Sequence, residues 1–119
     1  MGATFKSLII KKDPSDCSSI EVEFLVDSGA GYTLVPAGLL AQLGIRPHGE
    51  VELELADGTR LKRLLGGAYF EYLGEGAFSP VIFGEENEEP LLGVISLETL
   101  RLVHNPYKRE IYPQRVVRM

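Results

Sequence analysis

The chain has few of the residues on which metal and disulfide chemistry depend. Its 119 residues include one cysteine, two histidines and no tryptophan. A single Cys17 cannot form an internal disulfide, and neither His48 nor His104 belongs to a group of Cys, His and carboxylate side chains with metal-ligand spacing. The sequence therefore predicts no metal site, and nothing in it implies a cofactor.

Positive charge is also scarce, and long apolar runs are absent. Twelve Lys and Arg residues against seventeen Asp and Glu give a net charge of −5. No basic stripe is present, which argues against a nucleic-acid partner. No apolar run approaches the length of a transmembrane helix, which argues against a membrane partner. Without an apolar signal segment, an Asn-x-Ser/Thr sequon or a second cysteine, we expect a reducing, cytoplasmic location.

What the chain does have is short apolar runs separated by turn-forming residues. Thirteen glycines and seven prolines punctuate the sequence, and this pattern favours strands joined by turns. The length suits a single domain, residues 1–119, with its own core. We expect strands at residues 4–10, 20–26, 33–35, 50–55, 60–65, 68–73, 78–83, 102–103 and 110–112, an apolar stretch at 91–95, and a short helix at 36–43.

A hairpin is predicted in the middle of the chain. Residues 50–55 alternate strictly between acidic and apolar side chains, which is typical of a half-exposed strand. Asp57-Gly58 is a hairpin-turn dipeptide, after which residues 60–65 return. Because one face of the first strand is charged throughout, we expect this hairpin to protrude from the body of the protein.

The most informative segment is Leu25-Val26-Asp27-Ser28-Gly29-Ala30. An apolar run leads into it, so Asp27 is expected at the end of a buried strand, an approach that no other Asp in the chain has. A carboxylate in that position is costly to desolvate unless it is paired or used in chemistry. A second apolar segment, Leu91-Leu92-Gly93, follows later in the chain.

The order of these two segments resembles that in the retropepsin-like aspartic proteases, single-domain relatives of the retroviral proteases, and looks closest to their small prokaryotic-type members. The resemblance implies an all-β fold, a closed barrel with one short helix and a flap hairpin that covers the substrate. It implies Asp27 as the catalytic residue, with Ser28 and Gly29 supporting it. The implied substrate-binding residues are Ala30, Leu55, Ala56, Asp57, Gly58 and Leu91.

The implied activity is that of an aspartic endopeptidase, which activates a water between two carboxylates that share one proton. The chain contains one Asp-Ser-Gly turn, so the second carboxylate has to come from Asp27 of another copy, in a homodimer acting on a peptide or protein substrate. Retroviral members also carry a paired Asp and Arg where this chain has Gly31 and Val94. A non-catalytic β-rich dimerisation or peptide-binding module with the same fold is the alternative.

Two further segments have open interpretations. The acidic loop at residues 85–89 is either a solvated loop or a rim of the substrate cleft, in which case Glu88 and Glu89 flank the substrate and Leu91 lines a side-chain pocket. Ser96 is a candidate N-cap for a further short helix that ends at Leu100.

Overall fold

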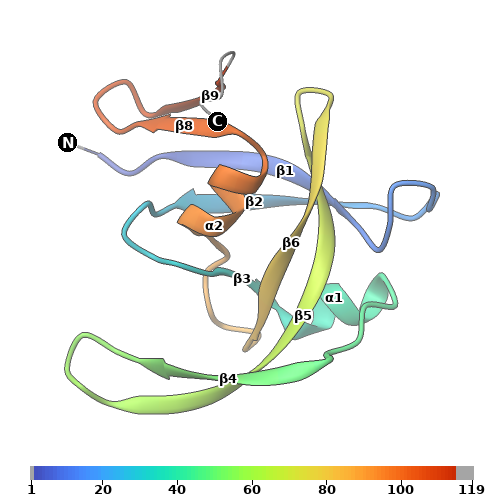
Figure 1. The fold of residues 1–119 in the computed structure, drawn as a ribbon, viewed down its shortest axis with the longest axis vertical. Helices are drawn as coiled ribbons and strands as arrows, with labels where there is room; N and C mark the ends of the chain where they lie inside the picture. Colours follow the sequence, from blue (N-terminus) through green and yellow to red (C-terminus); the bar gives the residue numbers. More distant parts are fainter. Residues whose placement is uncertain (1, 115–119) are drawn as a thin grey trace.

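Six β-strands form a closed ring of pairings around the hydrophobic core (Figure 1). The computed structural model describes residues 2–114. The predicted all-β class is confirmed, and the pairing of the sixth strand with the first closes the sheet on itself. The order around the ring is β1 (Phe5–Lys11), β2 (Ile20–Val26), β7 (Leu91–Leu92), β3 (Thr33–Pro36), β6 (Glu75–Gly84) and β5 (Arg60–Tyr72).

Alternating side chains of the first two strands point into the core. Ile10 of β1 is 1% exposed and Phe24 of β2 is fully buried, as expected for the two-residue period of a strand with one buried face. The Phe24 ring packs at 6.1 Å, centroid to centroid, from Phe70 of β5. Val26, the last residue of β2, is also buried, so the strand remains in the core up to the residue before Asp27.

The predicted protruding hairpin is formed by β4 (Gly49–Glu54) and the first half of β5, at the lower edge of Figure 1. β4 pairs with β5 alone and lies outside the ring. The prediction of two separate strands at 60–65 and 68–73 is wrong, because β5 is one strand of 13 residues. Gly66 and Gly67 continue the ladder opposite Val81 and Pro80 of β6 instead of forming a turn.

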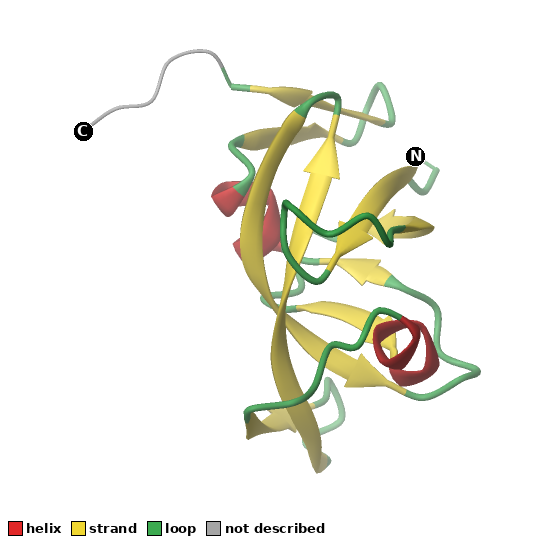
Figure 2. Cartoon of the chain, turned by 90° about the vertical axis from the view of Figure 1, so that its right-hand side faces the viewer, coloured by secondary structure: helices red, strands yellow, loops and turns green. Residues whose placement is uncertain are grey.

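Two short helices flank the strands, where the resemblance implied one (Figure 2). The first, α1 (Ala37–Gln42), follows Pro36, whose missing N–H costs no hydrogen bond at a helix start. The second, α2 (Val94–Thr99), has Gly93 as its N-cap, so the prediction of Ser96 as N-cap is wrong and the apolar stretch 91–95 is divided between β7 and α2. Across residues 2–114, neither helix has the length and apolarity to cross a membrane.

A second hairpin follows α2 and lies at the same end of the molecule as the beginning of β1 (Figure 1). It consists of β8 (Leu102–Asn105) and β9 (Glu110–Pro113), which pair with each other in a separate two-stranded sheet. The predicted pairing of residues 102–103 with 110–112 is confirmed. Leu102 and Ile111 anchor the hairpin, because both side chains belong to the main core.

Candidate active site

Asp27 lies directly after β2, and the strand beside it carries the second motif. Val26 is opposite Leu92 of β7 in parallel register, and the Asp27 N–H donates to the Leu92 carbonyl at 3.0 Å. The chain then turns, because Asp27 Oδ1 accepts the Gly29 N–H at 2.9 Å and the Ala30 N–H donates to the Asp27 carbonyl at 3.1 Å. One oxygen of the half-buried carboxylate is thereby held by its own turn.

Gly93 allows the two motifs to approach at backbone contact distance. A Cβ at this position would lie 2.5 Å from the Tyr32 carbonyl oxygen and 2.7 Å from that of Gly31. The Gly93 N–H donates to the Thr33 hydroxyl at 3.0 Å. Only glycine fits so close to two carbonyl groups of the main chain, which accounts for the glycine of the Leu-Leu-Gly segment.

Three buried hydroxyl groups behind Gly93 form one directed chain of hydrogen bonds. The Ser79 hydroxyl donates to the Pro80 carbonyl at 3.1 Å, so it accepts from the Ser96 hydroxyl at 2.7 Å. Ser96 in turn accepts from Thr33, and Thr33 accepts the Gly93 N–H. Because each hydroxyl has one hydrogen to donate, every step has a fixed direction, and the chain ties β3, β6 and α2 to the motif.

Main-chain hydrogen bonds join the loop after Asp27 to the beginning of α2. The Val94 N–H donates to the Ala30 carbonyl at 2.8 Å, and the Ile95 N–H donates to the Gly31 carbonyl at 3.0 Å. The first turn of α2 therefore supplies two N–H donors that have no partner within the helix. They hold the loop after Asp27 without a side-chain ion pair.

His104 is a site residue that sequence analysis missed. Its Nδ1 lies 3.4 Å from the Ser28 hydroxyl, a long contact, and its Nε2 lies 3.0 Å from the Thr4 hydroxyl. The Thr4 carbonyl also accepts the Val26 N–H at 2.8 Å. Nothing in the sequence around His104 indicates these contacts, because its partners are far away along the chain. Among residues 2–114, no group of three or more His, Cys, Asp or Glu side chains is placed to hold a metal.

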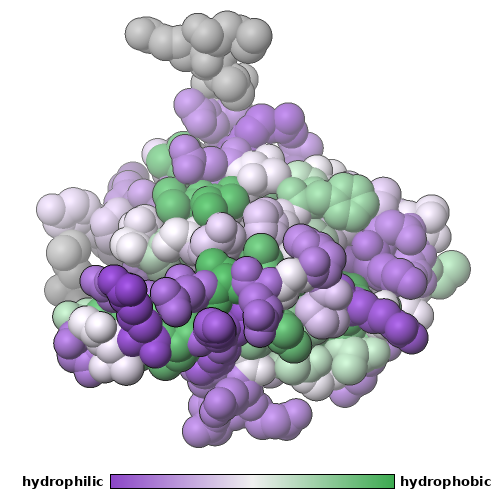
Figure 3. Space-filling model, turned by 60° about the horizontal axis from the view of Figure 1, so that its bottom comes forward, coloured by the Kyte–Doolittle hydropathy of each residue, from purple (hydrophilic) through white to green (hydrophobic). Residues whose placement is uncertain are grey.

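An apolar hollow of about 360 Å³ opens between the β4–β5 hairpin and the loop after Asp27. Figure 3 shows the hairpin end of the molecule, where apolar patches lie between hydrophilic side chains. Three of the predicted substrate-binding residues, Ala30, Leu55 and Leu91, line the hollow, and Ala56, Asp57 and Gly58 do not. Its remaining apolar walls are Leu34, Leu53, Leu61 and Ile82.

One ion pair is built into the wall of this hollow. Arg63 and Glu88 bind through both carboxylate oxygens, with Nη2 and Oε2 at 3.2 Å. The hydrogen bond from Arg63 lowers the pKa of Glu88, and the same bond raises the pKa of Arg63. Glu88 therefore rims the hollow as one interpretation predicted, whereas Glu89 is exposed and does not line it. Sequence analysis missed Arg63. Because Arg63 follows Leu61 by two residues in the strand, the two side chains lie on the same face, and both line the hollow.

The tip of the hairpin is a tight turn stabilised by Asp57. Its carboxylate accepts the Thr59 N–H at 2.9 Å, and hydrogen bonds from Thr59 lower the pKa of Asp57. Gly58 has φ +86°, a left-handed conformation that favours glycine, and its N–H donates to the Leu55 carbonyl at 2.9 Å. Ala56, Asp57 and Gly58 are thus exposed turn residues in this single chain.

Comparison with solved structures identifies the fold of the chain. A structure of EIAV protease complexed with the inhibitor HBY-793 matches with a TM-score of 0.64 and 14% sequence identity, covering 83% of this chain and 88% of that one. The chain has a retropepsin-like fold. The solution structure of the simian foamy virus (mac) protease matches it with a TM-score of 0.52 and 18% identity, covering 78% of this chain and 92% of that one. No protein-family model and no curated protein matches the sequence.

Within this retropepsin-like fold, the two segments singled out in the sequence are neighbours. Asp27 and Leu92 are joined by a main-chain hydrogen bond, and Gly93 packs against the loop that follows Ala30. The apolar hollow and the hairpin lie on the same side of that loop. The site therefore combines a carboxylate held by its turn, a space for an apolar side chain and a hairpin beside that space.

Proposed function

We propose that the protein is a homodimeric aspartic endopeptidase in which Asp27 of each chain supplies one of two catalytic carboxylates. The observation that carries this proposal is the position of Asp27. It follows a buried strand, is bonded to the Leu92 carbonyl, and lies in the turn that leads to the hollow at Ala30. Ser28 and Gly29 support the carboxylate, and the hollow with its hairpin receives the peptide.

The proposed chemistry needs two carboxylates close enough to share one proton. Like charges at that distance do not both ionise, so one group is an acid while the other is a base. The ionised Asp27 takes a proton from a water, whose oxygen attacks the scissile carbonyl carbon. The protonated Asp27 stabilises the oxyanion, and a proton passes to the leaving nitrogen as the C–N bond breaks. Activity is then lost when both carboxylates are ionised or both are protonated.

The homodimer follows from the single Asp-Ser-Gly turn in the chain, because a two-fold axis beside Asp27 completes the pair. Support for an interface near this turn comes from exposed aromatic side chains at the same end of the molecule. Phe5 and Tyr112 are each 45% exposed, and Tyr107 is 81% exposed. Phe5 begins the strand that pairs with β2, and both tyrosines belong to the β8–β9 hairpin that carries His104. Large apolar groups gathered in this way are typical of protein contact surfaces.

Replacing Asp27 with Asn tests the activity. The amide is nearly isosteric but cannot act as a base or share the proton, so we expect Asp27→Asn to abolish cleavage of an unfolded protein substrate. Thermal unfolding should remain cooperative. Asp16→Asn is the matched control, because Asp16 binds only its own exposed loop through the Ser18 N–H. Cleavage retained by Asp27→Asn would contradict the proposal.

The alternative, a non-catalytic dimerisation or peptide-binding module, is favoured by the absence of the Asp and Arg pair at Gly31 and Val94. A statine inhibitor of the pepstatin type distinguishes the two functions, because it mimics the tetrahedral intermediate and needs both carboxylates. We expect it to raise the melting temperature of the natural chain but not of Asp27→Asn. A cytoplasmic location remains a prediction from the single, exposed Cys17.

A further inference from the structure

A second groove runs from the hollow beside Ala30 along the outer side of the barrel. Two depressions of about 280 and 430 Å³ share the lining residues His48, Gly67 and Phe78, so they form one continuous surface. Tyr32 lines the first of them and also lines the apolar hollow beside Ala30. A peptide held in the hollow can therefore continue past Tyr32 into this groove.

The floor of the groove is apolar and lacks side chains where a peptide would cross it. A Cβ at Gly67 would have no neighbour within 4 Å, so space is open above that residue. Phe78 is 55% exposed, although its ring is held against Tyr69, edge to face at 5.1 Å. An aromatic ring that is fixed in place and left in water offers a contact for an apolar side chain.

The walls of the groove are basic. Lys12, Arg46 and His48 line it, and no carboxylate of residues 2–114 does. No ion pair among residues 2–114 includes Lys12 or Arg46. The groove thus carries two cations, Lys12 and Arg46, on a chain of net charge −5. In the apolar hollow, by contrast, Arg63 is paired with Glu88.

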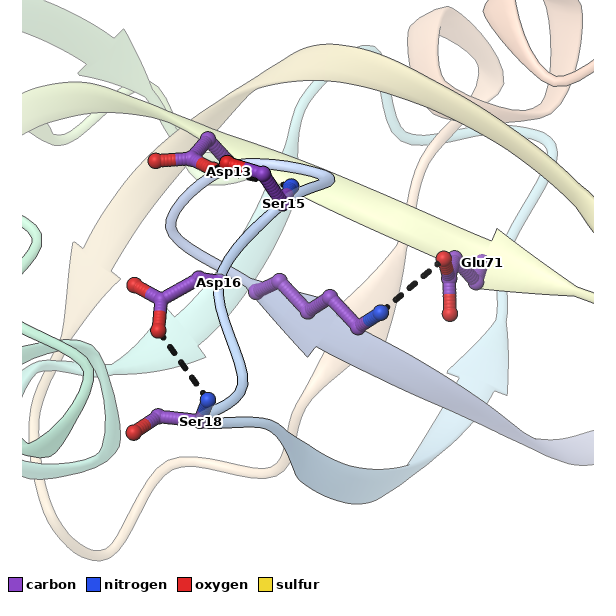
Figure 4. Close-up of polar contacts among 6 residues, drawn as sticks. Asp13, Ser15, Asp16, Ser18 and Glu71 are labelled. Carbon is purple, nitrogen blue, oxygen red and sulfur yellow. Dashed lines mark hydrogen bonds and ion pairs between the residues drawn. The ribbon is translucent and has the colours of Figure 1, made fainter.

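The acidic residues near Lys12 do not line the groove and form hydrogen bonds or ion pairs with other residues (Figure 4). Asp13 Oδ1 accepts the Ser15 N–H at 2.9 Å, and Asp16 Oδ1 accepts the Ser18 N–H at 3.0 Å. Glu71 pairs with Lys11 at 3.3 Å. The pKa of Asp13 is lowered by the hydrogen bonds from Ser15 and also by the nearby charge of Lys12. No ion pair among residues 2–114 joins Lys12 to Asp13, so the Lys12 ammonium group can still bind a ligand carboxylate.

We infer that this groove binds an acidic segment of the peptide substrate, outside the residues that flank the scissile bond. A carboxylate of the segment lies beside Lys12, Arg46 and His48, and a neighbouring apolar side chain packs on Phe78. The inference rests on the proposed peptidase function and adds a preference for substrates with an acidic residue next to an apolar one. Opposite charges across such an exposed surface raise the association rate and are weakened by salt.

The experiment uses peptides that share one cleavable centre and differ in their tails. A Leu-Asp-Glu tail is compared with Leu-Asn-Gln, and the tail is moved one residue at a time along either side of the centre. At one register we expect the acidic tail to raise kcat/KM about fivefold, the effect of a well-placed exposed ion pair. The advantage should fall when ionic strength rises from about 0.05 M to about 0.5 M.

Variants of the groove connect that preference to the basic side chains. Lys12→Gln and Arg46→Gln should each remove most of the advantage and leave cleavage of the neutral-tail peptides unchanged. Arg101→Gln, which removes an equal charge from the turn after α2, should preserve it, because Arg101 pairs with the exposed Glu75 and lines neither the groove nor the hollow. Equal kcat/KM for acidic and neutral tails at every register, with cleavage intact, would overturn the inference and leave the proposed function standing.

A binding measurement separates the two proposals if no peptide is cleaved. Fluorescence anisotropy of the labelled acidic-tail peptide is followed with Asp27→Asn protein, which keeps the groove. Tighter binding of the acidic tail than of the neutral tail, lost in the Asp27→Asn, Lys12→Gln double variant, supports the groove even if the chain is not a peptidase. Equal binding of both tails contradicts it.

Discussion

The imidazole of His104 lies within reach of the Ser28 hydroxyl, with 3.4 Å between Nδ1 and Oγ. Ser28 directly follows the proposed catalytic Asp27, and the second ring nitrogen of His104 lies 3.0 Å from the Thr4 hydroxyl. One side chain of the C-terminal hairpin therefore connects the catalytic turn to the beginning of β1. In the proposed peptidase, this contact makes His104 a positioning residue, which would act on Asp27 through Ser28.

Replacing His104 tests this role. His104→Ala should lower kcat about fivefold and change KM little, since a net hydrogen bond contributes about 1 kcal/mol. His104→Gln, whose amide both donates and accepts, should restore most of the loss. Steady-state kinetics of both variants provide the check. An unchanged kcat in His104→Ala would show that the turn is held without the imidazole.

Gly93 should tolerate no side chain. Gly93→Ala places a Cβ against the carbonyls of Tyr32 and Gly31, which belong to the main chain and cannot rotate away. We expect the free energy of unfolding to fall by at least about 2 kcal/mol. Gly49→Ala is the matched control, since its Cβ would have no neighbour within 4 Å. Urea titration of both proteins makes the comparison, and equal stability would refute the close approach.

The pair of Arg63 and Glu88 should make stability depend on pH in the acid range. The folded-state pKa of Glu88 is lowered by Arg63, so its contribution to stability is present above the unfolded-state pKa and is lost as pH falls through the folded-state pKa. Glu88→Gln should be less stable than the natural chain by about 1 kcal/mol near neutral pH. The two unfolding free energies should converge once the pH has fallen below the folded-state pKa of Glu88. A constant difference at all pH values would argue against the ion pair.

Cleavage should favour an aliphatic or aromatic side chain at the position that enters the hollow. Leucine and isoleucine side chains form half of its lining. Of the two carboxylates in the lining, Glu88 pairs with Arg63. The other, Glu54, pairs with Arg60, so the hollow offers no unpaired charge to a substrate Lys or Arg. A peptide with Leu at that position should have a higher kcat/KM than the same peptide with Lys or Glu there. A preference for Lys would restore the interpretation of residues 85–89 as an acidic cleft rim.

Those parts of the fold that depend on local pattern could be predicted from the sequence. The apolar run before Asp27 predicted a buried strand ending there, and the alternation at residues 50–55 with Asp57-Gly58 predicted the hairpin. Gly66 and Gly67 misled the prediction, because glycine is typical of turns but here lies in an extended strand paired with β6. That pairing is a tertiary contact, which local composition does not encode.

Only those site residues that belong to a local sequence motif could be predicted from the sequence. Asp27 and Gly93 belong to motifs with a fixed local geometry, whereas the contact of His104 with Ser28 joins residues that are 76 positions apart in the sequence. Arg63 and Glu88 likewise come from separate elements, β5 and the loop before β7. Such pairs depend on the barrel being closed, so they require the structure.

In the proposed enzyme each active site contains Asp27 from two chains, and mixing active with inactive chains tests this arrangement. Natural chains are incubated with a ninefold excess of Asp27→Asn chains until subunit exchange, followed with a fluorescent label, is complete. Random pairing leaves about one tenth of the natural chains with a competent partner, so activity should fall about tenfold. Activity that stays constant after complete exchange, or that belongs to a monomeric chain, would contradict the shared site.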